Sequence, residues 1–287
     1  MDTLTRVVTL NAAELTTRQI NQALRELPDG TSVTIVEPKG RHNLAVGLTS
    51  DIGITIDGNA GYYIGGLGDG PDLIVNGFTG WGIGENLMSG SIRVKGSVSQ
   101  SAAASAHGGL IVVEGDASLR AGISLKGGTL AIAGDVGNLT GFMAQAGTIL
   151  IGGNAGEALG DSLYEATIYV AGSIASFGAD ATPAELTEDD VTAVKQLCDK
   201  AGFDHVDPQN ITKVTSARAL YHFTTHNAGA TSAEPHLPPG SHRERSRAGR
   251  PRTVLDPRLR GPQEGPELRR PGLPHRLGVP VPARGLP

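Results

Sequence analysis

Three carboxylates stand out as residues that could do chemistry in this 287-residue sequence, namely Glu85, Asp161 and Glu165. Paired carboxylates act as acid and base in enzymes that cleave glycosidic bonds. Alternatively, these three residues, together with Asn86 and Tyr164, form a surface or partner-binding site through hydrogen bonds. We favour the second interpretation, and it depends on the elements that carry these residues.

Other chemistries find little support in the sequence. The single cysteine, Cys198, falls on the apolar face of an expected helix, which predicts a buried and unreactive thiol. Residues 65–69 (GGLGD) match one copy of a calcium-binding nonapeptide, but no second copy follows. The glycines at 80–84 match part of a dinucleotide-binding motif, but a further strand follows where that motif needs a helix. The histidines lack the spacing of metal ligands: His42, His107, His205, His222 and His226. We therefore predict no catalytic, cofactor-binding or metal-binding residue in this chain.

A glycine recurs every 19 residues through the middle of the sequence, and this repeat is the strongest indication of the fold. Aliphatic residues stand two and four positions before each glycine, whereas the residue between them varies and includes Thr55, Arg93 and Tyr169. Such alternation predicts a short strand with one buried face. The variable residue should face outward, so replacing Arg93 should cost less stability than replacing a repeated glycine. The structural glycines are Gly58, Gly77, Gly96, Gly115, Gly134, Gly153 and Gly172.

Two more columns of small residues, seven and thirteen positions after these glycines, predict corners in each repeat. Stacked repeats of strand, corner, strand and corner bury a continuous core. A left-handed hexapeptide β-helix would repeat about every 18 residues, so the spacing favours an all-β, right-handed parallel β-helix with seven 19-residue coils. The aromatic residues of the coils are not expected to align in one column, which disfavours a sugar-cleaving enzyme: Tyr62, Tyr63, Trp81, Tyr164 and Tyr169.

The segments around the predicted β-helix (residues 53–180) have different patterns. Residues 1–52 predict a small α/β cap, with strands at 5–10 and 32–36 and a helix at 17–27 capped by Thr16 or Thr17. Residues 181–230 predict a helical C-terminal cap. Its main helix should begin at Thr182 and Pro183 and end at Gly202.

The expected inner face of that helix holds Val191, Val194, Leu197 and Cys198, and a short helical element is expected at 216–223. Residues 231–287 contain 11 Arg, 12 Pro and no Lys, which predicts a disordered Arg/Pro-rich tail. An alternate reading frame of a GC-rich gene would also encode such a composition.

Charge is divided unevenly along the chain. Residues 1–230 hold 13 basic and 24 acidic residues, a net charge of −11, whereas residues 231–287 hold 11 basic and 5 acidic residues, a net charge of +6. The acidic body predicts no nucleic-acid partner. No signal peptide or membrane span is predicted, and the single cysteine fits a reducing compartment, so we expect a cytoplasmic protein.

Several segments resemble the GXGXG family: GWGIGENLMSG at 80–90, GLIVVEGDAS at 109–118, GISLKGG at 122–128, the stretch at 141–180, and SARALYHF at 216–223. This family includes the C-terminal β-helical domain of the glutamate synthase large subunit. It also includes one of the subunits of formylmethanofuran dehydrogenase. The chain is most similar to stand-alone glutamate synthase domain-3 subunits, such as the small subunit of N-methylglutamate synthase, and the similarity covers residues 5–230.

The resemblance implies a non-catalytic subunit of a glutamate-synthase-like oxidoreductase complex that serves glutamate and nitrogen metabolism, including methylamine utilisation. It implies two partners, a glutamine amidotransferase-like subunit and an FMN-binding subunit. FMN and the iron–sulfur cluster are expected on the second partner, and no cofactor is expected in this chain. Two alternatives remain: a scaffold in a formylmethanofuran-dehydrogenase-type complex, and a carbohydrate-active β-helix enzyme.

Overall fold

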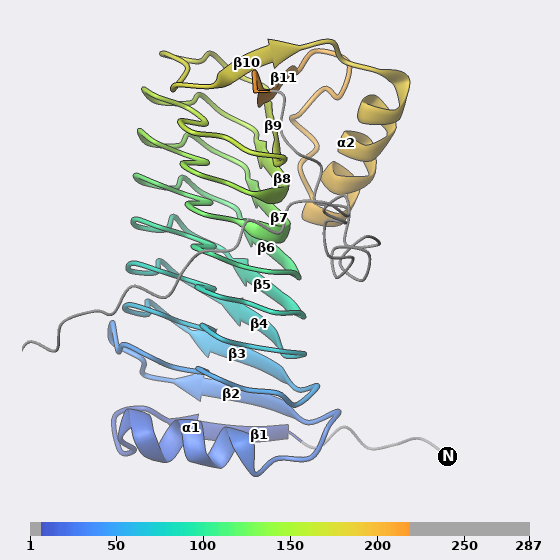
Figure 1. Cartoon of the computed structure of the whole chain (residues 1–287). Coiled ribbons are helices and arrows are strands. Elements are labelled where there is room, and N and C mark those ends of the chain that lie inside the picture. Colours follow the sequence, from blue (N-terminus) through green and yellow to red (C-terminus); the bar gives the residue numbers. More distant parts are fainter. Residues whose placement is uncertain (1–6, 219–287) are drawn as a thin grey trace, which may run out of the picture. The chain divides into compact units, whose positions relative to one another are not determined.

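The computed structural model describes residues 7–218, which form a right-handed parallel β-helix (Figure 1), as the 19-residue repeat predicts. The described elements are β1 (Val7–Asn11), α1 (Thr17–Arg25), β2 (Ser32–Val36), β3 (Gly53–Asp57), β4 (Asp72–Val75), β5 (Ser91–Val94), β6 (Leu110–Val113), β7 (Lys126–Ile132), β8 (Ala146–Ile151), β9 (Thr167–Val170), β10 (Ala181–Ala184), α2 (Glu188–Ala201) and β11 (Thr212–Ser216).

One sheet runs along the whole rod in the order β1 to β9, then β11 and β10. Its strands pair in parallel from β1 to β9. Between β3 and β9 each residue pairs with the one 19 positions later, as Ile54 does with Leu73, except at a bulge in β7. The aliphatic residues of the two inward columns are 0–2% exposed. They therefore form the continuous core that the alternation predicts.

The corner between Tyr63 and Leu67 explains why only some small residues need to be glycine. Three alternate residues of this corner, Tyr63, Gly65 and Leu67, have φ between +57° and +66°. The N–H groups of Tyr63 and Leu67 donate to carbonyls of the next coil, so the backbone stays paired through the corner. Only the middle position faces the core. At the equivalent Gly122, a Cβ would lie 2.5 Å from Cδ1 of Ile149.

The residues that follow the repeated glycines form a polar ladder along one edge of the rod. In each step a side-chain oxygen accepts from the backbone N–H of the equivalent residue in the next coil. Asp116 accepts from Asp135 at 2.8 Å, Asp135 accepts from Asn154 at 2.6 Å, and Asn154 accepts from Ser173 at 2.9 Å. The glycines before them allow the coils to approach closely, since a Cβ on Gly153 would lie 2.6 Å from the carbonyl carbon of Gly134.

The N-terminal elements cover the first coil, as expected for a cap. Thr16 is the N-cap of α1 and makes a capping box with Gln19. The side chain of Asn21 donates to the carbonyl of Asn43 at 2.7 Å and accepts from the N–H of Ala45 at 2.8 Å. These bonds satisfy backbone groups that the end of a β-helix leaves unpaired.

The predicted start of the C-terminal helix is wrong. Residues Ala181–Ala184 form strand β10, and α2 begins at Glu188, with Thr187 as N-cap in a capping box with Asp190. Pro183 is tolerated because β10 is the edge strand of the sheet. The predicted end at Gly202 is confirmed, with φ of +77°.

Other predictions for the C-terminal region have mixed outcomes. Ser216 belongs to strand β11 rather than to a helix. The rest of the element predicted at 216–223, His222, His226 and the tail at 231–287 lie outside the described residues. The predicted domain boundaries stay predictions.

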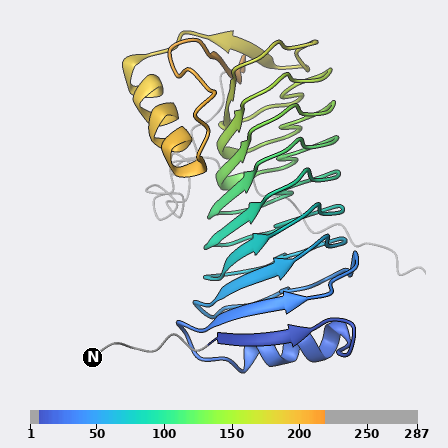
Figure 2. The same cartoon turned by 180° about the vertical axis from the view of Figure 1, so that it is seen from behind.

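Helix α2 packs on the outer face of the sheet (Figures 1 and 2), where the sequence predicts only exposed side chains. From β6 to β9 the outward residues are buried beneath it, including Val112 and Leu150, and they form a second apolar cluster with Val194 and Cys198 of the helix. Arg93 of β5 is in the same outward column and also contacts this helix. Its guanidinium donates to the carbonyls of Lys200 and Ala201 and caps the C-terminus of α2.

Candidate functional site

Of the carboxylates singled out by the sequence, Glu85 lies in a different coil from Asp161 and Glu165. Glu85 and Asp161 occupy the same column of the repeat but are four coils apart, which is about 19 Å at 4.8 Å per strand. Carboxylates that act as a pair on one glycosidic bond are about 5–9.5 Å apart. Glu85 and Asp161 therefore do not form an acid–base pair.

The other predicted site residues participate in contacts within and between coils. Asp161 accepts from the hydroxyl of Ser162 at 2.9 Å and from the N–H of Ala179 at 3.4 Å. The backbone N–H of Asn86 donates to Ala104, that of Tyr164 to Ala144, and that of Glu165 to Gln145. These bonds connect neighbouring coils. Asn86 lies in a different coil from Tyr164 and Glu165, so the three residues do not form one site.

The candidate nucleophile and metal ligands are separated as well. Cys198 is buried on the face of α2 that packs on the sheet, and this burial, aided by the charge of Asp199, raises the pKa of the thiol. His205 bonds to the carbonyl of Ala133 at 3.0 Å. Among residues 7–218, no three His, Cys, Asp or Glu side chains come together as metal ligands. No helix in this part of the chain is long and apolar enough to cross a membrane.

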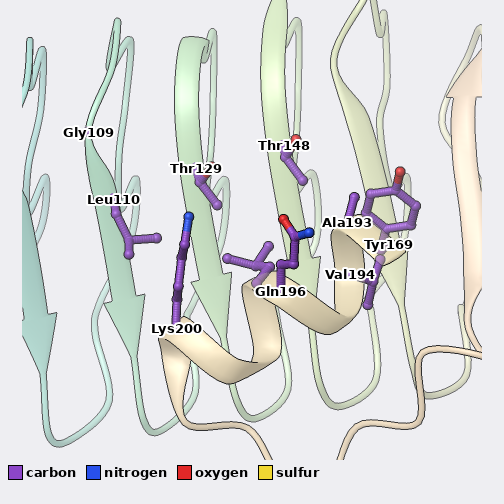
Figure 3. A pocket seen from close by; sticks show the side chains of 10 residues that line it. Gly109, Leu110, Thr129, Thr148, Tyr169, Ala193, Val194, Gln196 and Lys200 are labelled. Atoms are coloured by element: carbon purple, nitrogen blue, oxygen red, sulfur yellow. The ribbon is translucent and has the colours of Figure 1, made fainter. Parts of the chain in front are cut away.

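A cleft of about 380 Å³ lies between α2 and the sheet (Figure 3). Lys200 and Gln196 of the helix lie over the strands that carry Thr129 and Thr148, and Val194 and Tyr169 close the inner end. The hydroxyl of Tyr169 is already engaged, since it donates to Asp190 at 2.6 Å.

Asp190 is the centre of the polar network that fixes the start of α2. It accepts from Tyr169, from Lys213 at 2.8 Å and from Thr187 at 2.6 Å. Burial alone would raise the pKa of Asp190, but these hydrogen bonds outweigh burial and hold the pKa well below its ordinary value. Burial and the bond to the ionised Asp190 raise the pKa of Tyr169. The three donors thus hold Asp190 in its ionised form and fix its carboxylate at the start of α2.

An aromatic ladder, which the sequence interpretation missed, lies on the opposite side of the coil. The ring centroids of His42 and Tyr62 are 4.3 Å apart, those of Tyr62 and Trp81 are 5.2 Å apart, and both pairs are stacked. Tyr62 and Trp81 therefore share a column, which their 19-residue separation could have revealed, although the five aromatics of the coils do not all align in one column. Stacking covers both faces of Tyr62, so this ring offers only its edge to a ligand.

A second cavity of about 270 Å³ lies beside this ladder. Tyr63 and Trp81 line one end, Gly82 and Glu85 lie next to them, and small polar residues such as Ser101 line the rest. Gly82 lets these side chains pack directly against the backbone, since a Cβ there would lie 2.8 Å from Cδ1 of Tyr63 and 3.0 Å from Oε2 of Glu85.

Exposed apolar side chains gather on the same side of the rod. Six of the eleven large apolar side chains that the described residues expose occupy the columns that begin at Tyr62, Tyr63 and Leu67. We call these columns, together with the one that begins at Gly66, the apolar wall. Its six exposed members are Tyr62, Tyr63, Leu67, Trp81, Leu119 and Met143. A cluster of this kind on a protein surface commonly marks an interface with another protein.

A comparison of the sequence with known proteins finds a clear relative. The chain is 43% identical over 216 residues to "Protein GlxC" of Rhizobium meliloti (strain 1021), and the match covers 74% of this chain and 95% of the relative. A scan against protein-family models finds no match.

Proposed function

The chain belongs to the family of Protein GlxC, and from this premise we propose that it is a non-catalytic β-helix subunit of a cytoplasmic, glutamate-synthase-like complex. In this role it braces a glutamine amidotransferase-like subunit and an FMN-binding subunit. FMN and the iron–sulfur cluster belong to the second partner. The segments that resemble the GXGXG family, at 80–180 and 216–223, support this assignment.

The observation that carries the proposal is the constant register of the coils. Every strand from β3 to β9 pairs with the next at a step of 19 residues, apart from a local bulge in β7. Backbone hydrogen bonds also connect the corners from coil to coil. A rod whose coils are paired throughout resists bending and stretching, because any distortion must break several hydrogen bonds together. Such a body suits a spacer between two enzymes.

The ends of the rod are consistent with a subunit that binds partners through its sides. The first coil is covered by α1, and after the last coil β9 pairs with β11, which pairs with β10. The helix at one end and the β11–β10 pair at the other thus cover strand edges that could otherwise pair with another chain. Partners are thus expected at the lateral faces.

Affinity purification of the tagged full chain from its native cells tests the proposal. The expected result is co-purification of an amidotransferase-like chain and a flavin-binding chain, identified by mass spectrometry, with FMN absorbance assigned to the second. A matched control is the same purification with Gly122→Val, in which the coils around Gly122 cannot pack and partner recovery should fall. A purified chain that binds flavin by itself, or converts glutamine and 2-oxoglutarate unaided, contradicts the proposal.

A further inference from the structure

Two charged side chains of the apolar wall, Glu85 and Arg120, make no ion pair within residues 7–218. They are two coils apart, about 10 Å along the rod, which is too far for them to pair with each other. Arg120 is exposed beside Leu119. The wall therefore presents one cation, Arg120, and three carboxylates, Glu85, Glu157 and Asp161, that make no ion pair within the described residues. Of the three carboxylates, Glu85 is the one beside the exposed rings of Tyr63 and Trp81.

The cavity beside Glu85 has the features of a guanidinium site. The rings of Tyr63 and Trp81 and the carboxylate of Glu85 line one end of it, where Tyr63 and Glu85 pack against Gly82. A planar guanidinium can stack on aromatic rings and bond to a carboxylate at the same time, whereas an ammonium ion gains less from the rings. An arginine side chain is the best match to these groups.

The arrangement of the wall about Gln100 indicates where that arginine comes from. One coil before Gln100 are Trp81 and Gly82, and one coil after it are Leu119 and Arg120. A second copy, antiparallel to the first and related by a two-fold axis through the coil of Gln100, places its Arg120 over Gly82 and its Leu119 opposite Trp81.

The remaining rows of the wall fit the same arrangement. Two coils from the axis, Tyr63 and Leu67 of one copy face Leu139 and Met143 of the other, so apolar surface meets apolar surface. At the axis the wall carries small residues, including Ser101. These allow the two rods to approach each other closely.

We propose that the protein forms an antiparallel, two-fold symmetric dimer through the apolar wall, in which Arg120 of each copy occupies the Tyr63–Trp81–Glu85 cavity of the other. The interface is isologous, so this contact occurs twice. The inference does not rest on the proposed function, because the dimer forms from this chain alone.

Sedimentation of the purified full chain at about 0.15 M salt, which screens the repulsion of two acidic bodies, measures the dimer directly. Arg120→Glu and Glu85→Arg should each raise the dissociation constant about 100-fold, since each removes two contacts that contribute about tenfold apiece. The combined variant, Glu85→Arg with Arg120→Glu, restores opposite charges and should recover at least about tenfold. Lys195→Glu on the exposed face of α2 is the control and should change nothing.

A cross-linking experiment tests the position of the axis. Ser101→Cys places two thiols near each other across the axis, so diamide, which accepts the two electrons and two protons released, should convert this variant to a disulfide-linked dimer. Glu157→Cys is on the same wall but three coils from the axis, which separates its two thiols by about 29 Å along the rod, and it should stay uncross-linked.

A chain that stays monomeric at the highest soluble concentration overturns the proposal. So does a dimer that Arg120→Glu leaves unaffected, or equal cross-linking of the two cysteine variants. The proposal is also overturned if the Glu85 cavity binds an arginine of a different protein. In that case Glu85→Arg would abolish the complex, whereas Arg120→Glu would leave it unchanged.

Discussion

Replacing Gly122 by alanine tests how tightly the corner packs on the core. The methyl group would lie 2.5 Å from Cδ1 of Ile149, whereas ordinary carbon contacts are about 3.8 Å. Overpacking of this kind costs about 1–3 kcal/mol. The φ of +69° adds about 1–2 kcal/mol for a residue with a Cβ, so the variant should lose about 2–5 kcal/mol in unfolding free energy.

The repeat itself suggests a compensating change. At the four glycines of this column that precede an isoleucine by 27 residues, including Gly122 and Ile149, a Cβ would lie within 3 Å of that isoleucine. The column tolerates Ala103, with φ of +57°, where the residue 27 positions later is Leu130. Gly122→Ala combined with Ile149→Leu should therefore be more stable than the sum of the single effects by about 1–3 kcal/mol.

Urea unfolding followed by far-ultraviolet circular dichroism measures these differences. Gly30→Ala is the matched control, because Gly30 has φ of +76° but no atom within 4 Å of an added Cβ; it should lose only the backbone contribution of about 1–2 kcal/mol. The reasoning is refuted if Gly122→Ala is no more harmful than Gly30→Ala, or if Ile149→Leu fails to recover stability.

Three further predictions concern α2 and its contacts. Arg93→Ala removes two hydrogen bonds to the last carbonyls of the helix and should cost about 1–2 kcal/mol in urea unfolding, whereas Lys195→Ala, which breaks an exposed pair with Asp199, should cost less than about 0.5 kcal/mol. Leu150→Ala removes a side chain that is 0% exposed beneath α2 and should lower the unfolding free energy by about 2–5 kcal/mol. The loosened helix should also let Cys198 react faster with a thiol reagent. An unchanged reaction rate would contradict this prediction. The folded-state pKa of Asp190 is depressed, so the stability that its ionised form contributes is complete above the unfolded pKa of about 4 and is lost as pH falls below it. The difference in unfolding free energy between the wild type and Asp190→Asn should therefore shrink below about pH 4. A difference that stays constant with pH would argue against the network.

The β-helix could be predicted well from the sequence because each coil repeats the same pattern of glycine and aliphatic residues. The pattern of one coil is weak evidence, but seven copies at the same spacing reinforce one another. Helix α2 was harder. Thr182 and Pro183 resemble a helix start, but the pairing of β10 with β11 takes these residues into the sheet. The capping box of Thr187 and Asp190 was visible in the sequence and indicates the true start.

The surfaces of the rod were predicted less well than its core. A repeat defines which side chains face inward, but it does not say what covers the outer face. The change from Thr55 and Arg93 to Val112 and Leu150 in the outward column was the available signal for the docking of α2. The aromatic ladder needed only the comparison of Tyr62 with Trp81 across one repeat.

The strict 19-residue step also sets how this molecule can change in length. Removal of residues 58–76 would join Asp57 to Gly77 and leave every remaining inward side chain inward, while the rod became about 4.8 Å shorter. Removal of one residue more or fewer would turn buried side chains to the solvent from that point onward. Deletions or insertions that keep the core intact can therefore change the distance between two partners bound along the rod only in steps of one strand spacing.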